Sequence, residues 1–188
     1  MKYNPKLFIF TGPSGVGKGT VLKEFFNKAE NIIYSVSSTT RSPRDGEIDG
    51  VHYNFIKKEE FIDLINKDSF LEWAKYSENY YGTSKIFVEN AIKQGKSVLL
   101  EIELQGALQV MEKCKSAVSI FIKPPSFEEL EKRLRGRKSE DEETILKRLQ
   151  TAKKELENQD KFKYVIENDK VDEAALKLIE IYKKETEL

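Results

Sequence analysis

Residues 12–20, GPSGVGKGT, have the composition and spacing of a phosphate-binding loop. The pattern G-x-x-x-x-G-K follows an apolar run at residues 7–10 and opens an amphipathic stretch that begins at Lys18. Glycines let the backbone curve around phosphate oxygens, N–H groups at a helix N-terminus bind them, and the lysine faces the β- and γ-phosphates. The pattern therefore predicts nucleotide binding by Gly12, Pro13, Ser14, Gly15, Val16, Gly17, Lys18, Gly19 and Thr20.

The residue after the lysine departs from the common form of this loop. Ser or Thr usually stands there and supplies a hydroxyl to Mg²⁺, but the residue here is Gly19. Thr20 follows and offers a hydroxyl to the metal or to a phosphate. The loop alone predicts only that a nucleotide binds, and we expect Mg²⁺ as the cofactor that accompanies it, with Thr20 as one of the metal contacts.

Two arginines, Arg41 and Arg44, lie three positions apart in a loop rich in Ser and Thr. Two neighbouring guanidiniums suit a phosphate dianion, because each can donate two parallel hydrogen bonds to it. Tyr53 and Tyr81 add phenolic donors. An isolated pair of this kind is more often part of a solvated turn, but beside a phosphate-binding loop it predicts a second phosphate site.

Two glutamates, Glu101 and Glu103, close the apolar segment at residues 97–103, which we predict to be a buried strand. Alternation along the strand places both side chains on one face. Ligands of open α/β sheets bind beyond the carboxyl ends of the strands, so acidic groups there favour Mg²⁺ or substrate. A structural role for Glu103, as a helix cap or as an arginine partner, remains the alternative.

A charged stretch at residues 133–148 contains Arg133, Arg137 and Arg148, with Gly136 inside it. Phosphoryl transfer depends on stabilising the charge of the moving group, a task that suits arginines on a hinged flap. The alternative is a solvated helical face, since Glu129 and Arg133 are four residues apart and can pair along a helix.

Short β-branched or aromatic runs alternate with longer amphipathic segments, which predicts an α/β fold with a parallel sheet. We predict strands at residues 6–10, 97–103, 116–123 and 164–166, and helices at residues 18–28, 105–113 and 126–135. The apolar face of a closing helix is formed by Val171, Ala174, Ala175, Leu178, Ile179 and Tyr182. Residues 35–83 interrupt this rhythm and predict an antiparallel insertion around a helix at residues 58–67.

Composition excludes several classes of protein. The 188 residues carry a formal net charge of zero, which argues against a nucleic-acid or membrane-surface protein. No apolar stretch reaches the length of a signal-peptide core or of a membrane span. Cys114 and His52 are the single cysteine and histidine, which excludes an internal disulfide and a multi-histidine metal site. We therefore expect a cytoplasmic protein.

Residues 35–55 (SVSSTTRSPRDGEIDGVHYNF) and the Tyr-Tyr-Gly-Thr run at residues 80–83 resemble the guanylate kinases, a family of P-loop nucleoside monophosphate kinases, and the similarity extends over nearly the whole chain. The resemblance implies a P-loop NTPase-type three-layer sandwich with a central parallel sheet, a mixed antiparallel GMP-binding insertion and a short helical lid. It also implies one guanylate kinase domain over residues 1–188, with a core at residues 1–34, 84–125 and 156–188, a GMP-binding region at about 35–83 and a lid at about 126–155.

The resemblance implies that the γ-phosphoryl group of ATP is transferred to GMP, giving GDP and ADP, in purine nucleotide metabolism, with dGMP as a further acceptor. Glu72 then accepts hydrogen bonds from N1–H and the 2-amino group of guanine. The GMP-binding residues that it implies are Ser37, Arg41, Arg44, Glu47, Tyr53, Glu72, Tyr81, Thr83 and Glu103. The family usually has Asp at the position of Glu103, so a direct contact of this longer side chain with guanine or metal stays open.

On the ATP side, the resemblance implies that Arg133 lies near the phosphates or the adenine and that Asn168 borders the adenine. Arg137 and Arg148 match arginines that reach the transferred phosphoryl group when the lid closes. The catalytic residues that it implies are Lys18, Arg41, Arg137 and Arg148, and the metal contacts that we expect are Thr20 and Glu101, the latter directly or through water. The oligomeric state stays open.

Two alternatives also stay open. An adenylate kinase or another monophosphate kinase would share the Gly-Lys-Gly-Thr ending of the loop, although adenine has no N1–H to match Glu72. An interaction module with the same fold would bind phosphoproteins without catalysis. Such modules usually lose the loop lysine and belong to longer chains, whereas this chain retains Lys18.

Overall fold

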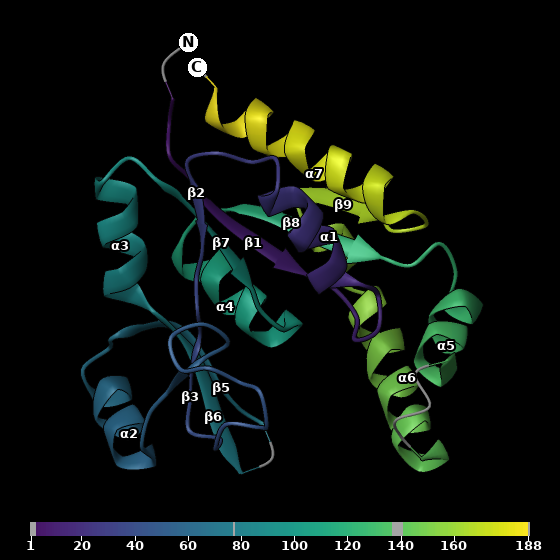
Figure 1. Ribbon diagram of the computed structural model, residues 1–188, viewed down its shortest axis with the longest axis horizontal. Helices are drawn as coiled ribbons and strands as arrows, with labels where there is room; N and C mark the ends of the chain where they lie inside the picture. The colour runs from purple at the N-terminus through teal and green to yellow at the C-terminus, as the bar shows by residue number, and fades with distance from the viewer. Residues whose placement is uncertain (1–2, 77, 137–140, 188) are drawn as a thin grey trace. The chain divides into compact units, whose positions relative to one another are not determined.

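Helices and strands alternate along the chain, as Figure 1 traces in colour from the N-terminus to the C-terminus. This computed structural model describes residues 3–76, 78–136 and 141–187. The chain divides into two compact units. The loop unit, which carries the phosphate-binding loop, comprises residues 1–4, 10–30 and 118–188, and the arginine unit, which carries Arg41 and Arg44, comprises residues 5–9 and 31–117.

A five-stranded sheet with the strand order β2-β7-β1-β8-β9 forms the centre of the fold. Its strands are β1 (Leu7–Thr11), β2 (Ile32–Tyr34), β7 (Ser97–Glu101), β8 (Val118–Lys123) and β9 (Tyr164–Glu167). β2 pairs in parallel with β7, and β8 pairs in parallel with β9. Phe8, Ile9 and Phe10 in β1 are at most 1% exposed, as expected for a strand that is covered on both faces. The predicted α/β fold with a central parallel sheet is confirmed.

The helices of the loop unit are α1 (Lys18–Phe26), α5 (Phe127–Gly136), α6 (Glu142–Leu156), the short 3₁₀ helix η1 (Gln159–Lys161) and α7 (Val171–Thr186). The rings of Phe25 on α1 and Tyr182 on α7 meet edge to face with centroids 5.8 Å apart. The Tyr182 hydroxyl donates to the backbone oxygen of Glu30 (2.5 Å) and bonds the hydroxyl of Tyr3 (3.0 Å). The predicted apolar face of α7 is buried except at Val171, which is half-buried.

The arginine unit contains a second sheet with the strand order β4-β3-β6-β5. Its strands are β3 (Ser38–Thr39), β4 (Asn54–Phe55), β5 (Phe70–Tyr76) and β6 (Asn79–Ser84), and its helices are α2 (Lys58–Asn66), α3 (Lys85–Lys93) and α4 (Leu104–Lys113). Phe61 of α2 is fully buried and stacks on Phe70 of β5 with ring centroids 4.4 Å apart. The predicted insertion around one helix is present, but parallel pairing of β3 with β4 makes its sheet mixed.

The strand predicted at residues 97–103 ends earlier than expected, at Glu101. Glu103 has an extended backbone and stands as the residue before α4, with its side chain exposed. The prediction that Glu101 and Glu103 share one face of a strand is therefore wrong. The buried Ile102 extended the apolar pattern by one residue beyond the last strand position.

The charged stretch predicted to be a hinged flap is largely helical where the structure describes it. α5 ends at Gly136, and α6 begins after Asp141, whose side chain accepts a hydrogen bond from the Thr144 N–H (2.8 Å). Ile145, Leu149 and Ala152 are buried at helical spacing along α6. The residue pattern gave no bounds for this helix, because charged residues surround its narrow apolar stripe, although the family resemblance implied a helical lid at about residues 126–155. The sequence analysis missed β2 and α3.

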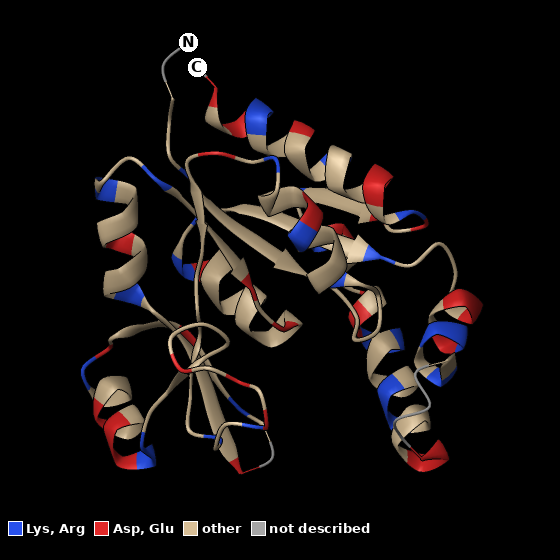
Figure 2. Ribbon diagram, viewed as in Figure 1, with Lys and Arg blue, Asp and Glu red and all other residues tan. Residues whose placement is uncertain are grey.

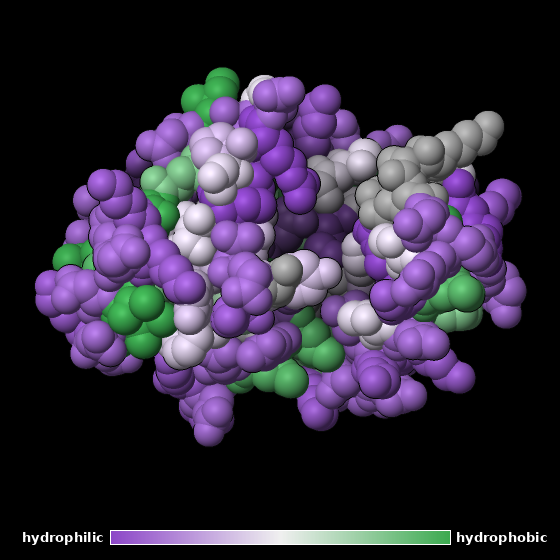
Figure 3. Space-filling view, turned by 90° about the horizontal axis from the view of Figure 1, so that it is seen from below, coloured by the Kyte–Doolittle hydropathy of each residue, from purple (hydrophilic) through white to green (hydrophobic). Residues whose placement is uncertain are grey.

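Charged residues lie mainly on the helices and loops, with both signs interspersed, while the strands of the central sheet contain few (Figure 2). The face shown in Figure 3 is mostly hydrophilic, with small scattered hydrophobic patches. Within the described ranges, no helix combines the length and the apolar character needed to cross a membrane.

The buried end of α7 provides a test of stability. Replacing Tyr182 with Phe removes the bond to the Glu30 carbonyl while keeping the ring, so the free energy of unfolding should fall by about 1 kcal/mol and Tm by about 2–4 °C. Urea unfolding of the purified chain measures the change. Tyr76→Phe is the control, because Tyr76 is 66% exposed and its replacement should leave Tm unchanged. Equal stability of the two variants would contradict the prediction.

Candidate functional site

The loop at residues 12–20 joins β1 to α1, and its geometry requires glycine at several positions, among them Gly12 and Gly17. A Cβ on Gly12 would lie 2.1 Å from the backbone oxygen of Ile122 on β8, so no side chain fits there. Gly17 precedes α1 with φ 96°, a left-handed conformation that other residues rarely adopt. Among the described residues, no side chain caps α1, so the N–H groups of its first turn are available to an anion.

The lysine of the loop lies over the loop backbone. The Lys18 ammonium donates hydrogen bonds to the carbonyl oxygens of Gly12 (2.6 Å) and Pro13 (3.2 Å). Its charge therefore sits beside the N–H groups that would surround a phosphate. Thr20, in the first turn of α1, is exposed, so its hydroxyl is accessible to a ligand.

Asn168, the first residue after β9, ties the loop to the sheet. Its backbone N–H donates to the Lys123 oxygen (2.8 Å), and its side-chain Nδ2 donates to the Val16 oxygen (2.7 Å). The residue is only 2% exposed, and its Oδ1 is buried without a hydrogen-bond partner in the described chain. Asn168 thus holds the middle of the loop and retains one buried acceptor.

Two of the three arginines predicted on the flap reach this loop region. Arg133 donates through Nε to Glu129 (3.0 Å) and through Nη1 to the backbone oxygen of Asn168 (2.9 Å). Nη2 of Arg148 donates to the hydroxyl of Ser14. Arg137 lies outside the described residues. An open hollow of about 350 Å³ is lined by Gly15, Gly17, Arg133, Asn168, Asp169 and Val171.

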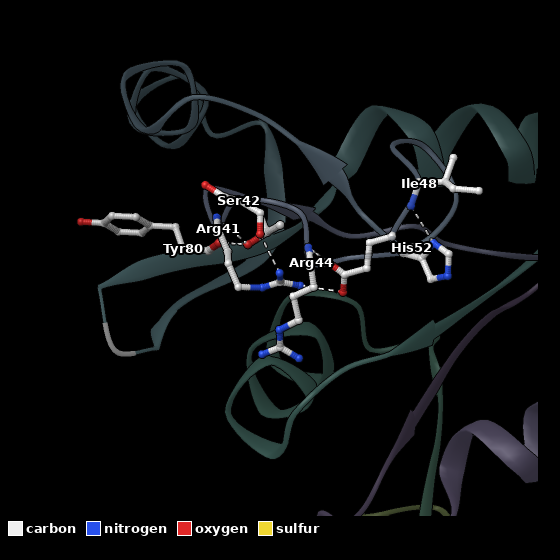
Figure 4. A network of polar contacts seen from close by, with 8 residues as sticks. Arg41, Ser42, Arg44, Ile48, His52 and Tyr80 are labelled. Atoms are coloured by element: carbon white, nitrogen blue, oxygen red, sulfur yellow. Dashed lines mark hydrogen bonds and ion pairs between the residues drawn. The ribbon is translucent and has the colours of Figure 1, made fainter. Parts of the chain in front are cut away.

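Arg41 is held in a fixed position in the arginine unit, as the dashed contacts in Figure 4 show. Its Nη2 donates to Oε1 of Glu47 (2.9 Å) and its Nη1 to the backbone oxygen of Ser42 (2.7 Å). Oε2 of Glu47 accepts the backbone N–H of Arg44 (2.8 Å). The Arg44 guanidinium itself turns away from this network and contacts no charged partner among the described residues (Figure 4).

The electrostatics of this loop keep its charged groups ionised. The hydrogen bond from Arg41, followed by the N–H of Arg44, lowers the pKa of Glu47 to about 2. The same pairing raises the pKa of Arg41. The Arg41 guanidinium also lies over the rings of Tyr53 (5.5 Å) and Phe55 (5.8 Å). One guanidinium is therefore oriented by the protein, and the second is left accessible to an anion.

A cavity of about 230 Å³ lies in the same unit, and most of the residues predicted for the second site meet there. The rings of Tyr53 and Tyr81 contact edge to face in its wall, with centroids 5.9 Å apart. Burial raises the pKa of Tyr53, so its phenol keeps its proton and can donate a hydrogen bond. The cavity is lined by Ser37, Tyr53, Glu72, Ala74, Tyr76, Tyr81, Gly82, Glu101, Ile102, Glu103 and Gly106.

Glu72 supplies a buried carboxyl group to this cavity. The residue is 5% exposed, and its Oε1 accepts a hydrogen bond of 2.6 Å from the hydroxyl of Thr83. Burial raises the pKa of Glu72, and the charge of Glu103 adds to that rise, while Thr83 and Lys113 oppose it. A carboxylate in such a place can accept two hydrogen bonds from the edge of a planar ligand.

Glu101 has a partner that the sequence reading missed. The hydroxyl of Tyr34, at the end of β2, donates to Oε2 of Glu101 (3.3 Å). Burial raises the pKa of Tyr34, so the phenol stays protonated and orients the carboxylate. Ala74, Tyr76, Ile102 and Gly106 also line the cavity without having been predicted. The only signal for Tyr34 was its place at the end of a short apolar run.

The described residues contain no group of three or more His, Cys, Asp or Glu side chains arranged to hold a metal ion. Such a group is not needed for an ion that is held mainly by the phosphates of a nucleotide and by water. Mg²⁺ commonly binds in this way, through substrate phosphates and few carboxylates.

Comparisons with known proteins agree with one another. The family model of guanylate kinase matches residues 4–185. A guanylate kinase from Synechococcus sp. (strain JA-3-3Ab) is 50% identical over 173 residues, which cover 92% of this chain and 80% of that relative. One from Prochlorococcus marinus subsp. pastoris is 50% identical over 97% of this chain and 100% of the relative. The crystal structure of guanylate kinase from Anaplasma phagocytophilum, 34% identical, covers 100% of this chain and 89% of its own with a TM-score of 0.80.

The raised pKa of Glu72 has a consequence for stability. A folded state that holds the proton of a carboxyl group more tightly than the unfolded state loses stability as the pH rises above the unfolded pKa. Glu72→Gln mimics the neutral form, so it should be more stable than the parent at pH 8, and the gain should shrink toward pH 4.

Urea unfolding at pH 4, 6 and 8 measures this effect. Glu180→Gln, an exposed change on α7 that does not act on Glu72, is the control and should change little at any of these pH values. The prediction would be contradicted if the stability of Glu72→Gln relative to the parent were lower at pH 8 than at pH 4.

Proposed function

This chain belongs to the guanylate kinase family, and we propose that its two candidate sites bind the two substrates of that family's reaction. The chain is an ATP:GMP phosphotransferase, which transfers the γ-phosphoryl group of ATP to GMP and releases ADP and GDP. The observation that carries our assignment of residues is the buried Glu72 carboxyl, in a cavity whose Tyr53 also contacts Arg41. One unit therefore contains both a hydrogen-bond acceptor for the guanine base and hydrogen-bond donors for the phosphate.

We assign guanine recognition to the buried end of this cavity. Ionised Glu72 accepts hydrogen bonds from N1–H and the 2-amino group, while hydroxyls of Ser37 and Thr83 serve the rest of the base edge. Thr83 has a second task, because its bond to Glu72 also orients the carboxylate. Glu103 stands exposed beside the cavity and provides a further acceptor for the 2-amino group.

We assign the GMP phosphate to the arginine loop. Arg41 and Arg44 bind its oxygens, Tyr53 and Tyr81 donate phenolic hydrogen bonds, and Glu47 keeps Arg41 oriented. Charge-assisted bonds of this kind are about twice as strong as neutral ones. None of these contacts requires the ribose 2′-hydroxyl, so we propose dGMP as a second acceptor.

ATP binds to the loop unit in this proposal. The N–H groups of residues 12–20 and Lys18 surround the β- and γ-phosphates, and Arg133 and Asn168 border the nucleotide beside the hollow that they line. The buried Oδ1 of Asn168 is an acceptor that suits an exocyclic amino group of the base.

We propose Mg²⁺ as an ion that the nucleotide brings with it. Thr20 offers an exposed hydroxyl, and Glu101 a carboxylate whose orientation Tyr34 sets, and these are the protein contacts that we propose, directly or through water. When bound, the ion neutralises charge on the phosphates that it contacts.

The chemistry then needs no general base. An oxygen of the GMP phosphate, already an anion near neutral pH, attacks the γ-phosphorus in line. The new P–O bond forms as the bond to the β–γ bridging oxygen breaks, and ADP leaves. Lys18, Arg41, Arg137 and Arg148 stabilise the charge that spreads over the moving group. Enclosing both substrates excludes water, which prevents wasteful hydrolysis of ATP.

We further propose which segments of the chain form the core, the GMP-binding region and the lid. Residues 1–34, 84–125 and 156–188 act as the core of one catalytic domain, residues at about 35–83 as its GMP-binding region and residues at about 126–155 as its lid. Cys114 is the one cysteine and the net charge is zero, which supports a cytoplasmic enzyme that does not bind nucleic acid or membranes.

A comparison of acceptors tests this function. With ATP and Mg²⁺ present, GMP should give the highest kcat/KM among GMP, AMP, UMP and dTMP, because the other bases lack the N1–H and 2-amino pair that matches Glu72. A coupled assay for ADP measures each rate. Turnover of AMP that equals that of GMP would contradict the assignment of Glu72, and full activity of Lys18→Ala would contradict that of the phosphate loop.

Substitution of Arg41 tests the second phosphate site. Arg41→Met removes a charge-assisted donor, so KM for GMP should rise by about 10- to 100-fold while KM for ATP stays within about twofold. Steady-state kinetics with each substrate varied in turn provide both values. Lys67→Met, an exposed change in the same unit, is the control and should alter neither. An equal rise in both KM values would show that the site is misplaced.

A further inference from the structure

We propose that Gly106, in the first turn of α4, is a positioning residue that fixes the carboxylate of Glu72 for guanine and so contributes to base selection. The proposal rests on the role assigned above to Glu72. Gly106 itself offers no side chain to a ligand, and its contribution is the space that it leaves.

The observation is a close approach between this glycine and one side chain. A Cβ built on Gly106 would lie 2.6 Å from Oε2 of Glu72, 3.1 Å from its Cδ and 3.4 Å from its Cγ. The three nearest atoms thus all belong to the Glu72 side chain. Real Cβ atoms essentially never come within 3.0 Å of another atom, so the observed position of the carboxylate requires glycine here.

Glu72 is fixed from the opposite side as well. Thr83 lies directly across the β5–β6 pair from Glu72, and its hydroxyl holds Oε1 at 2.6 Å. The side chain is buried, so few other positions are open to it. The carboxylate is therefore confined between a hydroxyl on β6 and the bare backbone of α4.

The helix itself would favour another residue. Glycine is a poor helix former and alanine the best, so α4 alone would be better served by alanine at this position. The atoms that an added methyl group would meet are at the end of the flexible Glu72 side chain and not in the backbone. The methyl group should therefore move the carboxylate and leave the fold intact. To reach ordinary contact at 3.4 Å, Oε2 must shift by about 0.8 Å from 2.6 Å.

A shift of this size matters for recognition. A displacement of about 1 Å in a positioned group can reduce the rate about 100-fold. Guanine presents two donors to Glu72, N1–H and the 2-amino group, whereas hypoxanthine presents only N1–H. Displacement of the carboxylate should therefore reduce discrimination between GMP and IMP as well as affinity for GMP.

Gly106→Ala tests the inference. We expect KM for GMP to rise by about 10- to 100-fold and the ratio of kcat/KM for GMP over IMP to fall by about tenfold. KM for ATP should stay within about twofold of the parent value, and Tm should equal or exceed that of the parent. Gln105→Ala is the matched control, since it adds alanine at the exposed neighbouring position of α4 and should change none of these values.

The Glu72→Ala variant separates the proposed role of Gly106 from the proposed function of Glu72. Glu72→Ala removes the atoms with which the methyl group clashes, so adding Gly106→Ala to it should not raise KM for GMP further. If Glu72→Ala alone leaves KM for GMP unchanged, the assigned role of Glu72 fails. If Glu72→Ala raises that KM and Gly106→Ala does not, the role of Gly106 is refuted and the proposed function stands. Loss of folding, or an equal rise in KM for ATP, would also refute it.

Discussion

Parallel pairing of strands sets the position of key side chains in both candidate sites. In the β8–β9 pair, Lys123 lies opposite Glu167, so the next residue, Asn168, bonds the Lys123 carbonyl and reaches the phosphate loop at Val16. In the β2–β7 pair, Tyr34 lies opposite Leu99, which lets its hydroxyl reach Glu101 at the end of β7. Each of these contacts follows from register, because paired strands that run the same way bring their last residues together.

Buried polar atoms without partners mark the same strand ends. Within the described residues, Thr11 Oγ1, Ser35 Oγ and Asn168 Oδ1 are buried and lack a hydrogen-bond partner. Thr11 closes β1, Ser35 follows β2 and Asn168 follows β9. Such groups are costly in a folded protein, and they persist where structure serves something other than stability. Their placement agrees with ligand binding beyond the carboxyl ends of the strands.

Local signals made much of this molecule predictable from its sequence. The glycines in residues 12–20 predict the backbone conformation of the loop, because Gly12 and Gly17 tolerate no side chain. What escaped prediction depends on tertiary context. α6 buries only a narrow apolar stripe among charged residues, and β2 is three residues long. Neither segment therefore shows a clear hydrophobic periodicity in the sequence. The contacts of Tyr34 with Glu101 and of Gly106 with Glu72 join segments far apart in sequence, which no local pattern encodes.

The pairing of Arg41 with Glu47 has a consequence for the thermodynamics of association. An unrestrained arginine has many rotamers, and a ligand that immobilises it must overcome the lost conformational entropy. Here Glu47, the Ser42 carbonyl and the ring of Tyr53 already restrict the guanidinium. That entropy is lost when the chain folds, so it opposes folding and would not oppose the phosphate binding that we propose for Arg41. Among the described residues, no ion pair restrains the Arg44 guanidinium, so a ligand that bound it would have to overcome this entropy cost.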